Sequence, residues 1–158
     1  MKTLILYATK HGAAKDIAER IAKLIPDSVV CNIKSDSIPV LDDFNCIIFG
    51  TSVYAGKIRK EASAFLANHE VDLASKHLGL FLSGMSPQED SQYFPTNFPK
   101  MVLDAVVVKS LLGGAFNPET ANFFEKLIMK MVTKQSGPIS TIDDERISAF
   151  VDALVSSY

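Results

Sequence analysis

The segment best suited to chemistry runs from Thr9 to Gly12, between a strand-like apolar run and a helical pattern. Where a strand feeds a helix through a tight turn, several backbone N–H groups point at one spot, and the helix dipole favours negative charge there. Gly12 allows close approach of the backbone, Thr9 offers a hydroxyl, and Lys10 brings positive charge. These features predict a phosphate site. The alternative is an ordinary strand-to-helix connection with a capping threonine.

Strands and helices alternate along the chain that must position this segment. Apolar runs predict strands over residues 3–8, 28–33, 45–49, 77–82 and 105–112. Apolar spacing of 3.6 residues predicts helices that begin near Ala13, Ile58 and Thr96, and a capping box at Thr141 predicts the start of the last helix. This alternation predicts an α/β fold, a doubly wound five-stranded parallel sheet with helices on both faces. The order 2-1-3-4-5 is the choice we adopt for that sheet, by analogy with known doubly wound folds. Residues 1–158 are expected to form a single domain.

In that strand order, the loops after strands 1, 3 and 4 meet outside the carboxyl ends of the strands, beside the switch point. These are the loops with unusual composition, over residues 9–14, 50–57 and 83–86. Tyr54 stands between small residues in the second loop, and Gly84 permits close approach in the third. The convergence of the three loops indicates a binding site.

The Thr-x-x-Gly pattern directly after the first strand resembles the FMN phosphate loop of flavodoxins. The resemblance implies FMN as cofactor, with its phosphate on the first loop, its ring stacked on Tyr54, and the polar ring edge at the amides of the third loop. Flavodoxins usually carry a further Thr or Ser where this chain has Ala13 and Ala14, so backbone donors must hold more of the phosphate. The implied FMN contacts are Thr9, Lys10, His11, Gly12, Ala13, Ala14, Thr51, Ser52, Val53, Tyr54, Ala55, Gly56, Ser83, Gly84 and Met85.

An insertion over residues 113–140 separates the last strand from the last helix. Asn117-Pro118-Glu119 predicts a helix start, and an amphipathic helix is expected over residues 118–134. The Leu-Ile-Met-Lys-Met run within it, and the opening Met-Lys-Thr-Leu-Ile-Leu, resemble the flavodoxin-like, menaquinone-linked protoporphyrinogen IX dehydrogenase family. The family carries an insertion tied to its activity and to its membrane-bound quinone acceptor. The helix is interpreted as packed on the domain, as a lid over the flavin, or as a surface that meets a membrane.

Composition and residue spacing argue against several classes of function and site. The net charge of −2 gives no electrostatic case for nucleic acid. No window is long and apolar enough to span a bilayer, and the chain enters a strand without a secretory signal, so a cytoplasmic location is expected. The three histidines have no metal-ligand spacing, and no metal site is predicted. Cys31 and Cys46 fall on strands either side of the first, too far apart for a disulfide, and are expected to be buried thiols.

The leading hypothesis is an FMN-binding flavodoxin-like redox protein that passes electrons through a non-covalent flavin to a partner protein or quinone. Whether it is a carrier or an oxidoreductase is left open, and no catalytic residue is assigned. One alternative is a quinone-linked protoporphyrinogen IX dehydrogenase of haem biosynthesis. Another is a flavin-free binding module, because Ala13 and Ala14 weaken the phosphate loop. A phospho-receiver domain shares the sheet order, but it requires an aspartate where strand 3 ends in Gly50-Thr51.

Overall fold

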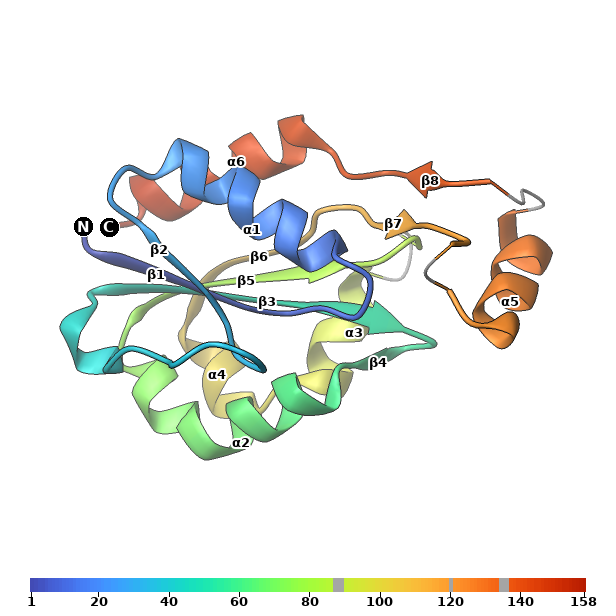
Figure 1. Ribbon diagram of the computed structural model, residues 1–158. Coiled ribbons are helices and arrows are strands. Elements are labelled where there is room, and N and C mark those ends of the chain that lie inside the picture. The colour runs from blue at the N-terminus through green and yellow to red at the C-terminus, as the bar shows by residue number, and fades with distance from the viewer. Residues whose placement is uncertain (87–89, 120, 134–136) are drawn as a thin grey trace.

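The computed structural model describes residues 1–86, 90–119, 121–133 and 137–158. Its centre is a parallel sheet in the order β2-β1-β3-β5-β6 (Figure 1). The strands are β1 (Thr3–Ala8), β2 (Val29–Asn32), β3 (Cys46–Tyr54), β4 (Lys57–Ile58), β5 (His77–Ser83), β6 (Val106–Leu111), β7 (Ala115–Phe116) and β8 (Ile139–Ser140). Because β5 and β6 are the fourth and fifth predicted strands, the predicted α/β class and sheet order are confirmed.

Helices cover both faces of this sheet (Figure 1). One face carries α1 (Ala13–Leu24) and α6 (Asp144–Ser156), and the other carries α2 (Lys60–Ala74), α3 (Asp90–Asn97) and α4 (Lys100–Ala105). A single 3₁₀ turn, η1, covers Leu41–Asp43 in the described chain. Among the described residues, no helix is long and apolar enough to cross a membrane.

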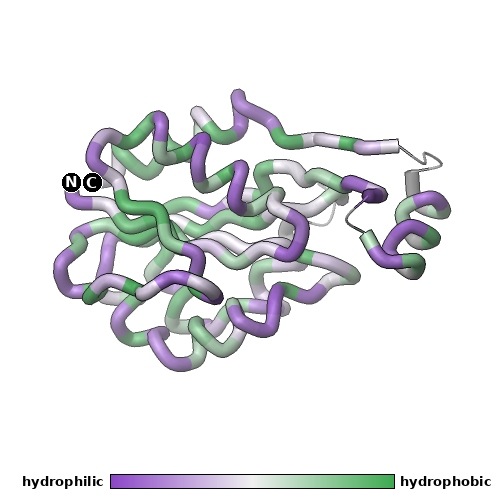
Figure 2. The backbone as a smooth tube through the Cα atoms, in the orientation of Figure 1, coloured by the Kyte–Doolittle hydropathy of each residue, from purple (hydrophilic) through white to green (hydrophobic). Residues whose placement is uncertain are grey.

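The core consists of two apolar layers, one on each side of the sheet. Successive side chains of a strand point to opposite faces. Leu4 and Leu6 of β1 therefore belong to the layer under α2 and α4, and Ile5 and Tyr7 belong to the layer under α1 and α6. Both layers consist of buried apolar residues, which explains why β1 is a continuous apolar run rather than an alternating one. Figure 2 shows the same pattern, with hydrophobic residues on the central strands and hydrophilic ones on the outer turns of the helices.

Cys31 on β2 and Cys46 on β3 lie on opposite sides of β1, opposite Leu6 and Thr3 respectively. Both thiols are buried and free, as predicted. Burial raises the pKa of both thiols, to about 11 for Cys46.

The segment predicted as the second loop is a hairpin instead. β3 continues to Tyr54 and turns back into β4, with Val53 opposite Ile58. The two turn residues, Ala55 and Gly56, have φ of 48° and 75°, as a two-residue turn between twisted antiparallel strands requires. Ile58 is consequently a strand residue, and α2 begins at Lys60.

The single helix predicted from Thr96 is divided into two. α3 begins earlier, at Asp90, and ends at Asn97, and α4 begins at Lys100. Pro99, the residue before α4, has φ −58° and ψ 143°. A proline also disfavours helical backbone at the residue that precedes it. The two helices therefore separate at this point.

The capping box predicted at Thr141 is wrong. Asp143 caps α6, and its carboxylate accepts hydrogen bonds from the N–H groups of Glu145 and Arg146, at 3.0 and 3.1 Å. Thr141 ties the insertion together instead, because its hydroxyl oxygen accepts from Gly114 N and its own N–H donates to Gly114 O at 2.7 Å.

The insertion consists of the β7–β8 ladder and α5 (Phe123–Thr133). The helix begins later than predicted, because Asn122 rather than Asn117 caps it. Asn122 Oδ1 accepts from Glu125 N at 2.9 Å, and the Glu125 carboxylate accepts from Asn122 N at 3.1 Å. This reciprocal pair is a capping box. Figure 1 shows α5 beyond the carboxyl ends of the central strands, at the end of the molecule opposite the two chain termini.

Candidate functional site

A cavity of about 280 Å³ lies where the loops after β1, β3 and β5 meet the insertion. Each of the three predicted loops contributes to its wall. The predicted residues that line it are Lys10, His11, Ala13, Ser52, Val53, Tyr54, Ser83, Gly84 and Met85. The insertion and the start of α2 supply the remaining residues, namely Arg59, Gly114, Ala115, Phe116, Asn122, Glu125 and Met129.

The first loop presents the start of α1 to this cavity. Gly12 is the N-cap residue at φ 95°, a left-handed conformation that glycine adopts readily. No side chain of the described residues caps the helix, and its first N–H groups have no acceptor within the helix itself. Thr9 Oγ1 accepts from Gly12 N at 2.9 Å, so this hydroxyl oxygen shapes the loop. The N-terminus of α1 is therefore suited to an anion.

The two alanines of this loop differ in their surroundings. Ala13 lines the cavity and keeps 7% of its surface exposed, whereas Ala14 is fully buried and belongs to the layer under α1 and α6. A side chain at position 13 can therefore reach a ligand, and one at position 14 packs into the core.

The hairpin supplies the aromatic wall. Tyr54 ends β3, lines the cavity and has 47% of its surface exposed, which leaves a ring face available to a planar ligand. Thr51 is fully buried within the same strand. Ala55 and Gly56 form the turn and lie outside the cavity lining.

The third loop is packed against the base of the insertion. Gly84 N donates to Gly113 O at 3.1 Å, so this amide, expected to face a ligand, already has an acceptor. A Cβ added to Gly114 would lie 2.8 Å from the carbonyl carbon of Gly84. Position 114 therefore requires glycine, and the backbones of loop and insertion touch.

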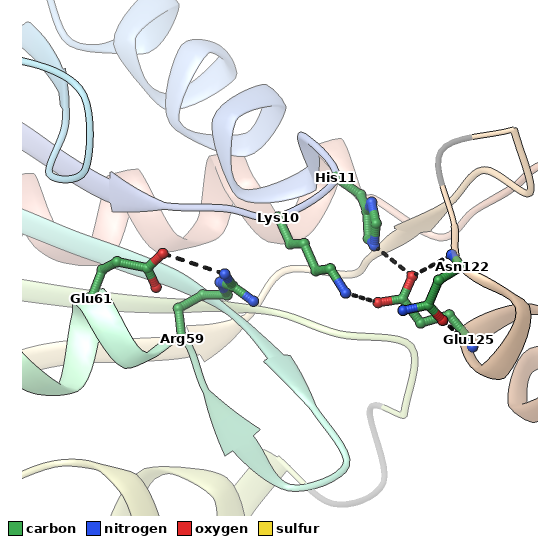
Figure 3. A network of polar contacts seen from close by, with 6 residues as sticks. All are labelled: Lys10, His11, Arg59, Glu61, Asn122 and Glu125. Carbon is green, nitrogen blue, oxygen red and sulfur yellow. Dashed lines mark hydrogen bonds and ion pairs between the residues drawn. The ribbon is translucent and has the colours of Figure 1, made fainter.

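Glu125 contacts two of the predicted site residues, but it was not itself predicted from the sequence. It lies in the first turn of α5 and is only 6% exposed. Its Oε1 atom is paired with Lys10 Nζ, and its Oε2 atom lies 2.9 Å from His11 Nε2 (Figure 3). The insertion is thereby fastened to the loop that begins α1. The pattern Asn122-x-x-Glu125 ahead of an apolar run indicates the helix start, but nothing local indicates the partners of the carboxylate.

The charge of Glu125 is stabilised in place. Burial tends to raise the pKa of its carboxyl group, but the hydrogen bonds from Lys10 and from the backbone N–H of Asn122, together with the charge of His11, outweigh burial and lower the pKa. Glu125 is therefore a carboxylate at neutral pH.

Arg59 is a further basic residue at the cavity wall, and it was not among the predicted site residues. It is the N-cap residue of α2, and its Nη2 atom lies 3.3 Å from Glu61 Oε1 (Figure 3). Within the described chain, its buried Nε atom has no hydrogen-bond partner. Among the described residues that line the cavity, Lys10 and Arg59 carry positive charge and Glu125 carries negative charge, so the balance of charge favours an anionic ligand.

Comparison with known proteins agrees with this architecture. Residues 4–141 match the family described as "Flavodoxin domain". The protoporphyrinogen IX dehydrogenase [quinone] of Leishmania major is 24% identical over 147 residues, which cover 86% of this chain and 64% of that protein. This chain thus spans less than two thirds of the length of that relative.

Solved structures show the same fold. The flavodoxin of Streptococcus pneumoniae TIGR4 has a TM-score of 0.61 at 16% identity and covers the whole of both chains. A flavoprotein of Lactobacillus acidophilus NCFM in complex with FMN has a TM-score of 0.53 at 17% identity, covering 72% of this chain and 91% of its own. From the sheet order, the position of the cavity and the family match over residues 4–141, we conclude that the chain belongs to the flavodoxin-domain family.

Proposed function

We propose that this protein binds FMN non-covalently in the cavity at the carboxyl edge of the sheet and works as a flavodoxin-like redox protein. The observation that carries the proposal is the meeting of an uncapped helix N-terminus, basic side chains and a half-exposed tyrosine around one cavity. The family match supports it, as does the structural likeness to the Lactobacillus acidophilus flavoprotein, which is in complex with FMN.

The residues present fit the parts of FMN. The N–H groups at the start of α1, with Lys10 and His11, suit the phosphate, since backbone donors and positive charge replace the hydroxyls that Ala13 and Ala14 lack. Tyr54 offers a ring face to the flavin, and Met85 and Phe116 add apolar wall. When bound, FMN supplies one- and two-electron chemistry, while this chain holds it, orients it and limits access of water.

The experiment is a visible spectrum of the purified protein, followed by titration of flavin-free protein with FMN. We expect binding that weakens about tenfold in Tyr54→Ala and much less in Tyr54→Phe, because phenylalanine keeps the stacking face. If FMN does not bind at micromolar concentration, the proposal fails and the flavin-free binding module takes its place.

We propose that the flavin exchanges electrons with a redox protein or a quinone. We also propose that the protein is cytoplasmic and that α5 contacts an anionic membrane surface, where such a partner is reached. Phe123, Leu127 and Met131 follow one another at four-residue spacing and are 75%, 45% and 73% exposed. Lys126 and Lys130 stand between them, also exposed. An apolar stripe flanked by cations suits an interface with anionic lipid.

Vesicle sedimentation tests this partner. Wild-type protein is expected to sediment with vesicles of anionic lipid and less with neutral ones, and Phe123→Ser/Met131→Ser is expected to stay in solution. Val71→Ser is the matched control, because Val71 is an apolar residue of α2 with 65% exposure. Equal sedimentation of the control and the double variant contradicts a role for the stripe.

The second candidate function is oxidation of protoporphyrinogen IX with a quinone acceptor, the activity named for the Leishmania major relative. The insertion favours it, because α5 supplies Glu125 and Met129 to the cavity wall, beside the proposed flavin site. FMN-loaded protein that exchanges electrons with a reductase but leaves protoporphyrinogen unchanged excludes this candidate.

A further inference from the structure

We propose that Glu125 sets the selectivity of the flavin site between FMN and uncharged flavin, because its carboxylate occupies the two basic side chains that a phosphate requires. This inference rests on the proposed function. It concerns a residue outside the predicted site, contributed by the insertion.

Glu125 contacts the two basic side chains of the first loop. Lys10 and His11 are consecutive residues of the loop ahead of α1, and both contact the same carboxylate (Figure 3). Both belong to the loop whose neighbouring backbone groups form the anion site. Glu125 is thus an anion tethered beside the position where the phosphate is expected.

Two anions compete at such a place. A phosphate brought to Lys10 and His11 lies close to the Glu125 carboxylate, and like charges at hydrogen-bonding range repel. Glu125 must then release the loop before the phosphate can bind both Lys10 and His11. Riboflavin has the same ring but no phosphate, and it meets no such competition.

The release of Glu125 also affects the cavity wall. Glu125 and Met129 are one turn apart on α5, and both line the cavity. At about 280 Å³ the cavity is just below the range for small-molecule sites, roughly 300–1,000 Å³. Movement of the start of α5 away from Lys10 therefore gives a larger ligand more room at the same time as it frees the cations.

Glu125→Gln removes the charge and keeps the helix. Glutamine serves as well as glutamate at this position of a capping box, so the bond to Asn122 N is retained. The matched control is Glu119→Gln, which removes one negative charge from an exposed position of the same insertion.

The test compares dissociation constants for FMN and riboflavin, measured from the quenching of flavin fluorescence. In Glu125→Gln, the preference for FMN over riboflavin is expected to rise about tenfold, the factor for one partly screened charge-assisted hydrogen bond. Glu119→Gln is expected to keep the wild-type ratio. If FMN binds and the ratio is the same in all three proteins, Glu125 has no role in selectivity and the inference is overturned while the proposed function stands.

A second measurement works without flavin, with inorganic phosphate as the probe. Amide hydrogen exchange along α5 is expected to speed up in wild-type protein when phosphate replaces chloride at equal ionic strength. In Glu125→Gln, amide hydrogen exchange along α5 is expected to be fast in both salts. If FMN binds neither protein but this phosphate response is found, the flavin function fails and the competition at Lys10 and His11 is retained. The absence of the phosphate response, whatever flavin does, overturns the competition.

Discussion

The phosphate loop can be strengthened at one of its two alanines and not at the other. Ala13 lies in the first turn of α1 and faces the cavity, whereas Ala14 points into the core with no exposed surface. We predict that Ala13→Ser tightens FMN binding and that Ala14→Ser does not. The pair is matched, since each substitution adds the same hydroxyl to adjacent positions of one helix.

The magnitude follows from the chemistry of the added group. A hydrogen bond to a charged group contributes about 1.5–3 kcal/mol, and the lower value applies at a site open to solvent. The expected gain in affinity of Ala13→Ser for FMN is therefore about tenfold. The intrinsic loss of helix propensity affects free and bound protein alike and leaves the dissociation constant unchanged. In Ala14→Ser the buried hydroxyl lowers the free energy of unfolding by about 1–3 kcal/mol.

Fluorescence titration with FMN and with riboflavin, and urea unfolding of the flavin-free proteins, provide the assay. Tighter binding of FMN alone in Ala13→Ser, with lower unfolding free energy in Ala14→Ser, is the expected pattern. The reasoning is refuted if Ala13→Ser tightens riboflavin as much as FMN, because the hydroxyl then does not contact phosphate. Equal effects of the two substitutions refute the assignment of Ala13 to the cavity and Ala14 to the core.

Three further predictions concern the stability of the fold. Ala55 has φ 48°, which an L-residue with a Cβ adopts only with strain, so Ala55→Gly is expected to raise the free energy of unfolding by about 0.5–1 kcal/mol in urea. Asp143→Ala removes the cap of α6 and is expected to lower that free energy by about 1 kcal/mol, while Asp143→Asn stays close to wild type. The pKa of Cys46 is raised by burial from 9.0 to about 11, so its contribution to stability is complete below pH 9 and is lost as the pH rises toward 11. Thermal unfolding at pH 8 to 11 checks the sign, and Cys46→Ala is expected to flatten the decline.

The strands could be predicted from residue types alone, since the reason for them is local, whereas the sheet order was adopted by analogy with flavodoxin-like folds. The run from Thr3 to Ala8 is apolar because both faces of a central parallel strand are covered, and the change to 3.6-residue spacing at Ala13 marks a helix. Crossovers in parallel sheets have one hand, so the alternation of elements was enough to place three loops at one edge. The N-terminal anion loop and Tyr54 followed from that placement.

The boundaries that failed were those decided by competition between local patterns and pairing. Residues Thr51–Lys57 form a hairpin because strand pairing and a positive-φ turn outweigh a loop-like composition. Asn122 caps α5 in place of Asn117 because the side chain of Glu125 completes the reciprocal bond. Thr141 is hydrogen-bonded to Gly114 at the base of the insertion, so Asp143 rather than Thr141 caps α6.

Which residues line the cavity was decided only by the tertiary structure. The contacts of Glu125 with Lys10 and His11 join residues 115 and 114 positions apart, and no periodicity in the chain relates them. Arg59 lines the cavity because the hairpin shifts the start of α2 to Lys60. The helical spacing of apolar residues does not predict this shift. Local hydrogen bonding and burial periodicity act over a few residues and determine the elements. Which charged side chains meet is determined only after the elements have packed and the insertion has folded against the sheet edge.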